Sequence, residues 1–347
     1  MKILQEMKDY GHEQLVFTRD EKSGLKAIIA IHDCTLGPAL GGTRMWNYAS
    51  DTDALYDVLR LSRGMTLKNS AAGLNLGGGK AVIIGDPAAK SEEMLKAFGR
   101  FVERLNGTYI TAEDVNISVA DAEVIHTQTT HIAGLSCESG DPSPLTARGV
   151  WQGIRAVAKT ALGADSLEGF TIAVQGLGKV GWTLCEHLHA EEAKLLVADL
   201  NEAAMKRAAE CFNAKVADIG EIVYAECDIF SPCALGAVIS RDNIPMLHCR
   251  AIAGAANNVL RDNDAGDLLK QKGIAYAPDY IINAGGVINV AGEIYGKYDR
   301  TDVLEKVDNI YNTITAIISE SAKTGRPEYQ IAEELAMERI IRARNNG

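Results

Sequence analysis

The sequence predicts a two-domain α/β protein: an N-terminal α/β domain, then a Rossmann-type doubly wound parallel sheet, with a cleft between them. Three observations support this class. The chain has 347 residues, 47% of them hydrophobic, which is enough for two cores. Short buried strand-like runs alternate with helical stretches. A GxGxxG motif directly follows one of these runs.

The first predicted domain spans residues 1–140. Its apolar, β-prone runs and its helically spaced segments alternate, which is typical of an α/β domain. We expect strands at 25–31, 81–84 and 108–111, and helices at 51–65 and 92–105.

The second predicted domain spans 141–330. Residues 140–144 contain two prolines and a glycine, which cannot continue a helix or strand, and a helix should begin near Thr146. Buried strands are expected at 170–175, 194–198, 228–230 and 250–253. The last 45 residues have helical apolar spacing, and residues 331–347 should form a C-terminal helix that packs back on the first domain.

Composition excludes several classes of partner and site. The net charge of -11 and the lack of any basic run argue against nucleic acid. No apolar run approaches the roughly 20 residues that span a bilayer, so no membrane partner is expected. Seven cysteines without a C-x-x-C pair, and no signal-like N-terminus, indicate reduced thiols in a cytoplasmic protein. No His, Cys or Asp cluster has metal-ligand spacing, so no metal is expected.

The GxGxxG motif predicts a dinucleotide site. It consists of Gly176, Gly178 and Gly181, with Lys179 and Val180 between the last two glycines. Such glycines permit a tight turn and let a pyrophosphate approach the backbone. Asp199 ends the next expected strand, 21 positions after Gly178, where an acid would bind ribose hydroxyls and repel a 2′-phosphate. The motif therefore favours NAD over NADP.

Residues 64–82 place two lysines among small and apolar residues. This is not a phosphate-binding P-loop, because Leu74 and Ala81 replace its required first Gly and its Ser or Thr. Three consecutive glycines, 77–79, should bring backbone close to whatever Lys80 faces. In an apolar, glycine-walled cleft the pKa of a lysine falls, so that it can act as a base. Asp114, at an expected strand end, is placed to hydrogen-bond Lys80.

Two further segments combine amides with small residues. Residues 253–258 contain Asn257, and residues 283–290 begin with Asn283. Loops after the strands of a dinucleotide fold line the cofactor crevice, so these amides could hold nicotinamide or substrate.

Together these segments resemble the Glu/Leu/Phe/Val amino acid dehydrogenase family, and most closely its leucine-specific branch. The resemblance extends over nearly the whole chain, through residues 36–44, 64–82, 111–114, 142–147, 176–181, 231–236, the Asn257 loop and 277–290.

The resemblance implies roles for individual residues. Lys68 would hold the substrate carboxylate, Lys80 would be the base, and Asp114 would assist proton transfer. The remaining positions border the substrate or the nicotinamide: Gly41, Met65, Thr146 and Asn257 in the site, and Leu40, Ala112, Val287 and Val290 as walls of an aliphatic side-chain pocket. The expected protein is a homo-oligomer that oxidatively deaminates a small L-amino acid, leucine, valine or isoleucine, with NAD.

Several alternatives remain open. Residues 116–118 and the loop 136–140 depart from the leucine pattern, so phenylalanine or tryptophan could be the substrate. A 2-hydroxy acid dehydrogenase would share the dinucleotide fold but needs a catalytic His, and none of the seven histidines lies in such a motif. A non-catalytic NAD-binding sensor should have lost Lys68, Lys80 or Asp114, and all three are present.

Overall fold

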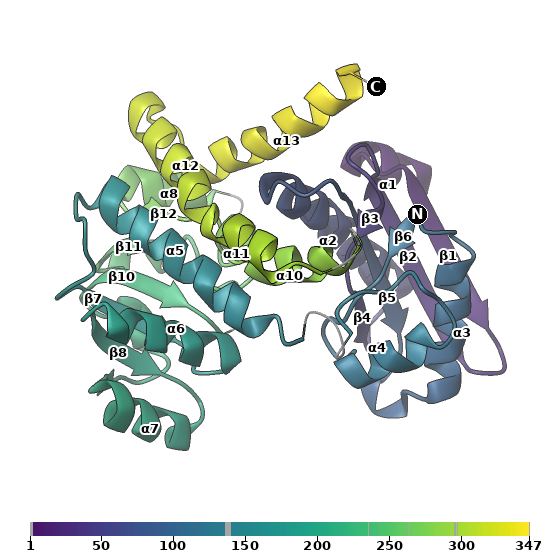
Figure 1. Cartoon of the computed structure of the whole chain (residues 1–347), viewed down its shortest axis with the longest axis horizontal. Helices are drawn as coiled ribbons and strands as arrows, with labels where there is room; N and C mark the ends of the chain where they lie inside the picture. The colour runs from purple at the N-terminus through teal and green to yellow at the C-terminus, as the bar shows by residue number, and fades with distance from the viewer. Residues whose placement is uncertain are drawn as a thin grey trace. The chain divides into compact units, whose positions relative to one another are not determined.

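A computed structural model describes residues 3–135, 140–234, 236–262, 264–294, 296 and 298–346. The chain divides into two compact units (Figure 1). The first contains residues 1–141, 290–298 and 336–347, and the second contains 142–289 and 299–335. Residues 290–298 therefore differ from the predicted division, since they group with the first unit, where the Glu293 carboxylate accepts a hydrogen bond from the Gly134 amide at 2.8 Å. Of the loop predicted at 136–140, residues 136–139 lie outside the described part of the chain.

The first unit contains a mixed six-stranded sheet. Its path runs β1-β2-β5-β3-β6, with β4 also paired to β5. The β1, β2 and β5 strands are antiparallel neighbours, whereas β3 and β4 run parallel to β5, and β6 runs parallel to β3. The strands are β1 (Gln14–Asp20), β2 (Leu25–Asp33), β3 (Ala39–Leu40), β4 (Thr43–Trp46), β5 (Gly77–Ile84) and β6 (Tyr109–Ile110).

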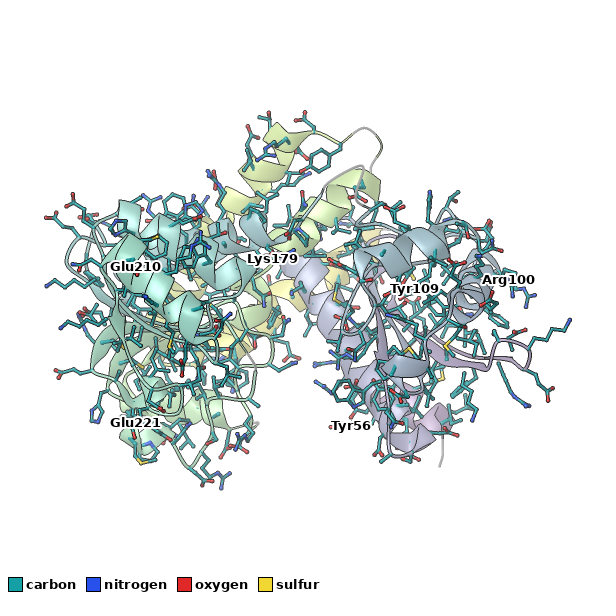
Figure 2. The ribbon with its side chains drawn as sticks, turned by 90° about the horizontal axis from the view of Figure 1, so that it is seen from below. Tyr56, Arg100, Tyr109, Lys179, Glu210 and Glu221 are labelled. Carbon is teal, nitrogen blue, oxygen red and sulfur yellow. The ribbon has the colours of Figure 1, made fainter. Side chains whose placement is uncertain are left out.

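Side chains that alternate along these strands build two cores, one on each face of the sheet. On β2, Ile29 packs in one core and Ile28 in the other. The second core includes Val82 of β5 and the apolar face of α2. The helices of this unit are α1 (Ile3–Tyr10), α2 (Asp51–Ala71), α3 (Glu92–Glu103) and α4 (Val119–His126), with a 3₁₀ turn at Pro87–Ala89. Tyr109 is fully buried in this unit, whereas Arg100 on α3 is exposed at its edge (Figure 2).

Local hydrogen bonds explain where these helices begin. The Ser50 side chain accepts a hydrogen bond from the Asp53 amide ahead of α2, and Ser91 does the same for Met94 ahead of α3. Each satisfies an amide that has no partner within its helix. The sequence predicted both helices, but α2 continues six residues beyond the expected end, to Ala71.

The second unit contains an all-parallel sheet in the order β12-β11-β10-β7-β8-β9. This is the doubly wound order in which the chain reverses direction across the sheet beside β7. The turn after β7 therefore lies at the topological switch point, where such folds bind ligands. The strands are β7 (Thr171–Gln175), β8 (Lys194–Ala198), β9 (Lys215–Val216), β10 (Cys227–Pro232), β11 (Cys249–Ile252) and β12 (Ala275–Tyr276).

Helices connect and follow these strands. They are α5 (Ser143–Ala161), α6 (Lys179–Ala190), α7 (Glu202–Phe212), α8 (Ala265–Lys272), α9 (Asp279–Ile282), α10 (Gly285–Ile294), α11 (Arg300–Asp308), α12 (Ile310–Thr324) and α13 (Glu328–Asn346), with 3₁₀ turns at Ile222–Tyr224 and Ile244–Met246. The C-terminal region is thus three successive helices. Gly325, with φ of +73°, ends α12, and Pro327 precedes α13.

The middle of α13 is bound to the end of α2. Arg339 donates hydrogen bonds to the Leu74 carbonyl at 2.5 Å and to the Asn75 side chain at 2.6 Å. The Ser70 hydroxyl donates to the Ala336 carbonyl at 2.6 Å. The bonds from Arg339 satisfy groups just beyond the end of α2, which have no partner within that helix.

No helix in the described ranges has both the length and the apolar character needed to cross a membrane.

Candidate active site

Lys80 lies on the face of the first sheet that packs against α2. Lys80 and Val82 are two residues apart on β5, so they share a face. Val82 packs with Leu55 and Val58 of α2. Lys80 is only 5% exposed, which places an amino group in the layer between sheet and helix.

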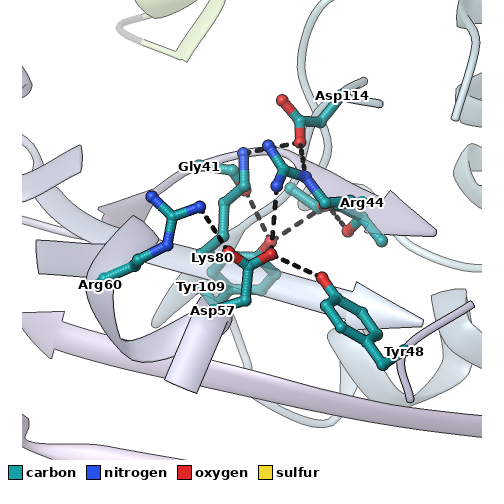
Figure 3. Close-up of polar contacts among 10 residues, drawn as sticks. Gly41, Arg44, Tyr48, Asp57, Arg60, Lys80, Tyr109 and Asp114 are labelled. Carbon is teal, nitrogen blue, oxygen red and sulfur yellow. Dashed lines mark hydrogen bonds and ion pairs between the residues drawn. The ribbon is translucent and has the colours of Figure 1, made fainter. Parts of the chain in front are cut away.

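Asp114 is the carboxylate that faces Lys80. It ends the segment after β6, which hydrogen bonds to β4 through the Thr43 amide and the Ala112 carbonyl at 2.9 Å. The Lys80 Nζ atom lies 3.1 Å from Asp114 Oδ2 (Figure 3). The contact predicted between these two side chains is therefore present.

A second cation contacts the same carboxylate oxygen. Arg44 of β4 is in register with Val82, so it extends from the same face of the sheet as Lys80. Its Nε atom lies 3.1 Å from Asp114 Oδ2, and its Nη1 atom lies 3.1 Å from Asp57 Oδ2. Arg44 thus joins two carboxylates, one after β6 and one on α2 (Figure 3).

Asp57 in turn has two further partners. The Tyr48 hydroxyl donates to Asp57 Oδ2 at 2.7 Å, and Arg60 Nη2 lies 2.7 Å from Asp57 Oδ1. Asp57, Tyr48 and Arg60 were not predicted from the sequence, and Arg44 was predicted only as part of a segment that resembles the family. One signal was available: Asp57 interrupts the apolar face of α2, and Arg60 follows three positions later.

Burial and neighbouring charges set the protonation of the pair. Burial lowers the pKa of Lys80 because it disfavours the ammonium form; Asp114 opposes this shift and Arg44 adds to it. Burial would raise the pKa of Asp114, but the charges of Lys80 and Arg44 outweigh it, so the pKa of this carboxyl lies below its usual value. The site thus favours an ionised Asp114 and eases loss of the Lys80 proton.

The glycines around Lys80 permit close packing within the protein. A Cβ atom on Gly78 would lie 2.1 Å from the Thr66 amide of α2, and one on Gly79 would lie 2.7 Å from the Tyr109 ring. A Cβ atom on Gly41 would lie 1.8 Å from the Gly79 carbonyl oxygen. We expected these glycines to form the wall of a cleft beside Lys80. At Gly78 and Gly79 this expectation is corrected, because both residues belong to β5 and let α2 and the Tyr109 ring pack closely against the strand.

The other predicted substrate residues of the first unit lie on the elements around Lys80. Leu40 is fully buried at the end of β3, directly before Gly41. Met65 and Lys68 are half-buried and three residues apart on α2, and the Met65 Cγ atom would lie 3.0 Å from a Cβ on Gly41. Ala112, just before Asp114, is half-buried, and Val290 of α10 packs beside Gly134.

The GxGxxG turn follows β7 as predicted. Gly176 has φ of +101°, a conformation that favours glycine, and a Cβ there would lie 2.8 Å from the Ala234 side chain. A Cβ on Gly181 would lie 1.9 Å from the Gly176 carbonyl oxygen. A Cβ on Gly178, by contrast, would meet no atom of the described residues within 4 Å beyond its chain neighbours and its own helix, so space is open at the N-terminus of α6.

This open space lies at a helix N-terminus, where dinucleotide folds hold a pyrophosphate group. Gly178 is the N-cap residue of α6 and has no side chain that could bond the first amides of the helix. The next residues, Lys179 and Val180, begin its first turn. The first amides of a helix have no partner within it and attract anions. Asp199, at the end of β8, accepts hydrogen bonds from the Leu177 amide at 2.5 Å and the Asn201 amide at 2.8 Å, which fix its carboxylate beside the turn.

The two asparagines predicted in the second unit contact each other. Asn283 Nδ2 donates to Asn257 Oδ1 at 2.8 Å and to the Ala255 carbonyl at 3.0 Å. Asn283 is 5% exposed, and its Oδ1 atom is buried without a partner among the described residues. Asn257 is exposed, so the buried side-chain amide of Asn283 orients the accessible side-chain amide of Asn257.

Thr146 and Val287 occupy α5 and α10. The Thr146 hydroxyl donates to the Pro142 carbonyl at 3.0 Å and would lie 2.7 Å from a Cβ on Gly286. Glycine at this position therefore lets α10 begin beside the first turn of α5. That turn begins at Ser143, three residues before the predicted start. Val287 is half-buried on the first turn of α10.

No group of three or more His, Cys, Asp or Glu side chains is arranged to hold a metal ion in the described part of the chain. Two histidines there have structural partners: His12 bonds to Ser62 at 2.7 Å, and His32 bonds to Thr66 at 2.8 Å.

Comparisons with known proteins identify the family of the chain. Residues 12–131 match the Glu/Leu/Phe/Val dehydrogenase, dimerisation domain, and residues 198–347 match the Glutamate/Leucine/Phenylalanine/Valine dehydrogenase domain. A leucine dehydrogenase of Bacillus subtilis is 55% identical over 100% of this chain and 96% of its own length. A valine dehydrogenase of Streptomyces coelicolor is 46% identical over 96% and 93%.

A solved structure has the same fold. The crystal structure of L-tryptophan dehydrogenase from Nostoc punctiforme superposes with a TM-score of 0.89 at 42% identity, covering 99% of both chains. The sequence relatives and this structure extend over both units. The chain therefore belongs to the Glu/Leu/Phe/Val dehydrogenase family of amino acid dehydrogenases.

Proposed function

We propose that this protein catalyses the NAD-dependent, reversible oxidative deamination of a branched-chain L-amino acid, chiefly leucine and also valine and isoleucine. The amino acid, water and NAD⁺ yield the 2-oxo acid, ammonium, NADH and a proton. The observation that carries the proposal is the buried contact of 3.1 Å between Lys80 and Asp114. Full-length identity of 55% to a leucine dehydrogenase supports the choice of substrate.

Lys80 is the base of this reaction. Its pKa is lowered by burial, which favours the neutral amine that can accept a proton from the water that attacks the imino carbon of the oxidised substrate. Asp114 stabilises the ammonium that results and takes part in passing the proton on. Lys68, whose amino group carries the charge complementary to a carboxylate, holds the substrate carboxylate.

NAD, when bound, supplies the acceptor for the hydride that leaves the substrate Cα. Gly176, Gly178 and Gly181 would hold its pyrophosphate together with the first turn of α6, and Asp199 its ribose hydroxyls. Thr146, Asn257 and Asn283 would position the nicotinamide and the substrate. The open space at Gly178 and the fixed carboxylate of Asp199 support the pyrophosphate and ribose assignments. The resemblance to the family supports the roles of Thr146 and Asn257, and the contact between Asn283 and Asn257 supports the role of Asn283.

Leu40, Ala112, Val287 and Val290 would form the walls of the side-chain pocket. All four are aliphatic, and none supplies a charge that would select a glutamate side chain. An aliphatic pocket discriminates between side chains by about 1–3 kcal/mol per methylene, so leucine, valine and isoleucine should all react. We also infer a homo-oligomer, because residues 12–131 match a domain described as a dimerisation domain.

The test is formation of NADH at 340 nm with each L-amino acid in turn, using NAD and then NADP. We expect turnover of leucine, valine and isoleucine, and kcat/KM at least about tenfold higher with NAD because Asp199 would repel a 2′-phosphate. Preference for phenylalanine or tryptophan would overturn the pocket assignment while keeping the chemistry. Absence of turnover with every amino acid would overturn the enzymatic proposal in favour of an NAD-binding sensor.

A further inference from the structure

Asp114 presents its two oxygens to different surroundings. Both cations that contact it, Lys80 Nζ and Arg44 Nε, lie 3.1 Å from Oδ2. No described residue makes a hydrogen bond or ion pair with Oδ1, and Figure 3 shows this oxygen turned away from both cations. One oxygen is therefore fixed by the protein, and the other is left to reactants or solvent.

Arg44 is fixed from its other side. Its Nη1 atom contacts Asp57, which is only 9% exposed and is also bound by Tyr48 and Arg60. A guanidinium with two carboxylate partners on different elements has little rotational freedom. Its charge therefore stays at a fixed place beside Asp114.

The charges of these contacting groups balance only when Lys80 is neutral. Arg44 and Arg60 carry two positive charges, and Asp57 and Asp114 carry two negative charges. A protonated Lys80 adds a third positive charge, on a side chain that is itself almost fully buried. Repulsion from Arg44 thus opposes the attraction of Asp114, whereas Asp57 attracts the ammonium at longer range.

We propose that Arg44, held by Asp57, is a positioning residue of the reaction: it fixes Asp114 Oδ2 beside Lys80 and opposes protonation of Lys80. This inference rests on the proposed role of Lys80 as the base. Under this proposal the charge of Arg44 opposes protonation of the Lys80 amino group, and the charge of Asp57 favours it. A purely structural role, in which Arg44 only joins β4 to α2, predicts no such opposition.

The experiment compares Arg44→Gln, Arg44→Lys and Asp57→Asn with the wild-type protein, with Arg100→Gln on the exposed face of α3 as the matched control. Two quantities are measured across pH. The first is kcat/KM for leucine. The second is the NMR titration of ¹³Cε-labelled Lys80, with its signal identified by its loss in Lys80→Met. The NMR titration needs no turnover.

Arg44→Gln should raise the pH at which Lys80 titrates by about one unit and move the acid limb of kcat/KM by the same amount. Asp57→Asn should move both in the opposite direction, because it removes an attracting charge. Arg44→Lys keeps the charge but cannot reach both carboxylates, so it should restore the limb to near its wild-type position while kcat stays reduced severalfold. Arg100→Gln should change neither quantity.

Equal loss of activity at every pH, with the Lys80 titration unmoved in Arg44→Gln and Asp57→Asn, would overturn the inference. If Arg44→Gln does not fold, Arg44→Met takes its place in the same two measurements, and an unmoved Lys80 titration in that variant contradicts the proposal. A wild-type protein without turnover on any amino acid would overturn the proposed function alone. The Lys80 titration would then still show whether Arg44 controls its charge.

Discussion

The two candidate sites of this protein are built in different ways. The site in the first unit consists of charged side chains, Lys80, Asp114, Arg44 and Asp57, brought together from β5, the segment after β6, β4 and α2. The site in the second unit is largely backbone: a glycine turn and the first amides of α6, with Asp199 beside them. A side-chain site should respond to changes of charge, and a backbone site to changes of volume. Charge changes in the first site and volume changes in the second therefore separate the two.

The largest effect is expected from a change of charge in the first site. Asp114→Asn keeps nearly the same volume but removes the counter-charge of Lys80. We expect kcat to fall about 10² to 10³-fold, because loss of a group in proton transfer commonly has this effect. Affinity for NADH, measured by fluorescence titration, should stay within a factor of about three. Glu113→Gln is the neighbouring control and should keep most of the activity. A large loss of NADH affinity in Asp114→Asn would show that the two sites are not separable in this way.

A change of volume in the second site should weaken NADH binding. This effect should be smaller than the loss of kcat in Asp114→Asn. Gly178→Ala places a methyl group in open space, so the protein should fold normally but bind NADH roughly 10 to 100-fold more weakly. Gly181→Ala is the matched variant. Its methyl group would lie 1.9 Å from the Gly176 carbonyl oxygen, so it should lower the melting temperature as well. Normal NADH affinity in Gly178→Ala would contradict the placement of the pyrophosphate.

The smallest effect concerns pH and the stability of the first unit. His12 is 8% exposed, and burial, together with the charge of His32, lowers its pKa from 6.5 to about 4. The unfolded chain then binds more protons than the folded one between these values. The contribution of this residue to stability should be full above pH 6.5 and decline as pH falls toward 4, with a loss of about 2 kcal/mol at pH 5.

Urea unfolding at pH 7 and pH 5 measures this effect. The wild-type protein should be less stable at pH 5, and His12→Gln should narrow the difference between the two pH values. His126→Gln, at an exposed position of α4, should leave the difference unchanged. An equal difference in His12→Gln and the wild type would contradict the assignment of the pH dependence to His12.

The same contrast explains what the sequence could predict. The dinucleotide turn is local, because strand, glycines, helix and acid follow one another within about 30 residues, and all were predicted at their observed places. The contact of Lys80 with Asp114 was also predicted, from the unusual residues around each. Arg44, Asp57 and Tyr48 were missed because their roles depend on how β4 and α2 align with β5, and no spacing along the chain encodes this alignment.

Short or exposed strands were missed for a related reason. The two-residue strands β9 and β12 are too short for an alternating pattern, and β1 is an edge strand with Phe17 53% exposed, so its hydrophobic pattern is weak. The sequence correctly predicted close approach to the backbone of glycines 77–79 beside Lys80. The groups that approach Gly78 and Gly79, however, are α2 and Tyr109 of the protein itself and not an open cleft. Sequence alone shows that a glycine permits close approach without showing what approaches it.

The most direct test of the central claim is the turnover of Lys80→Ala beside the wild-type protein, with leucine and NAD, followed at 340 nm. We predict that the variant folds, binds NADH with near wild-type affinity and loses at least about 10³-fold in kcat, because the base is gone while the backbone site is intact. Substantial turnover in a folded Lys80→Ala protein would contradict the claim that Lys80 is the base.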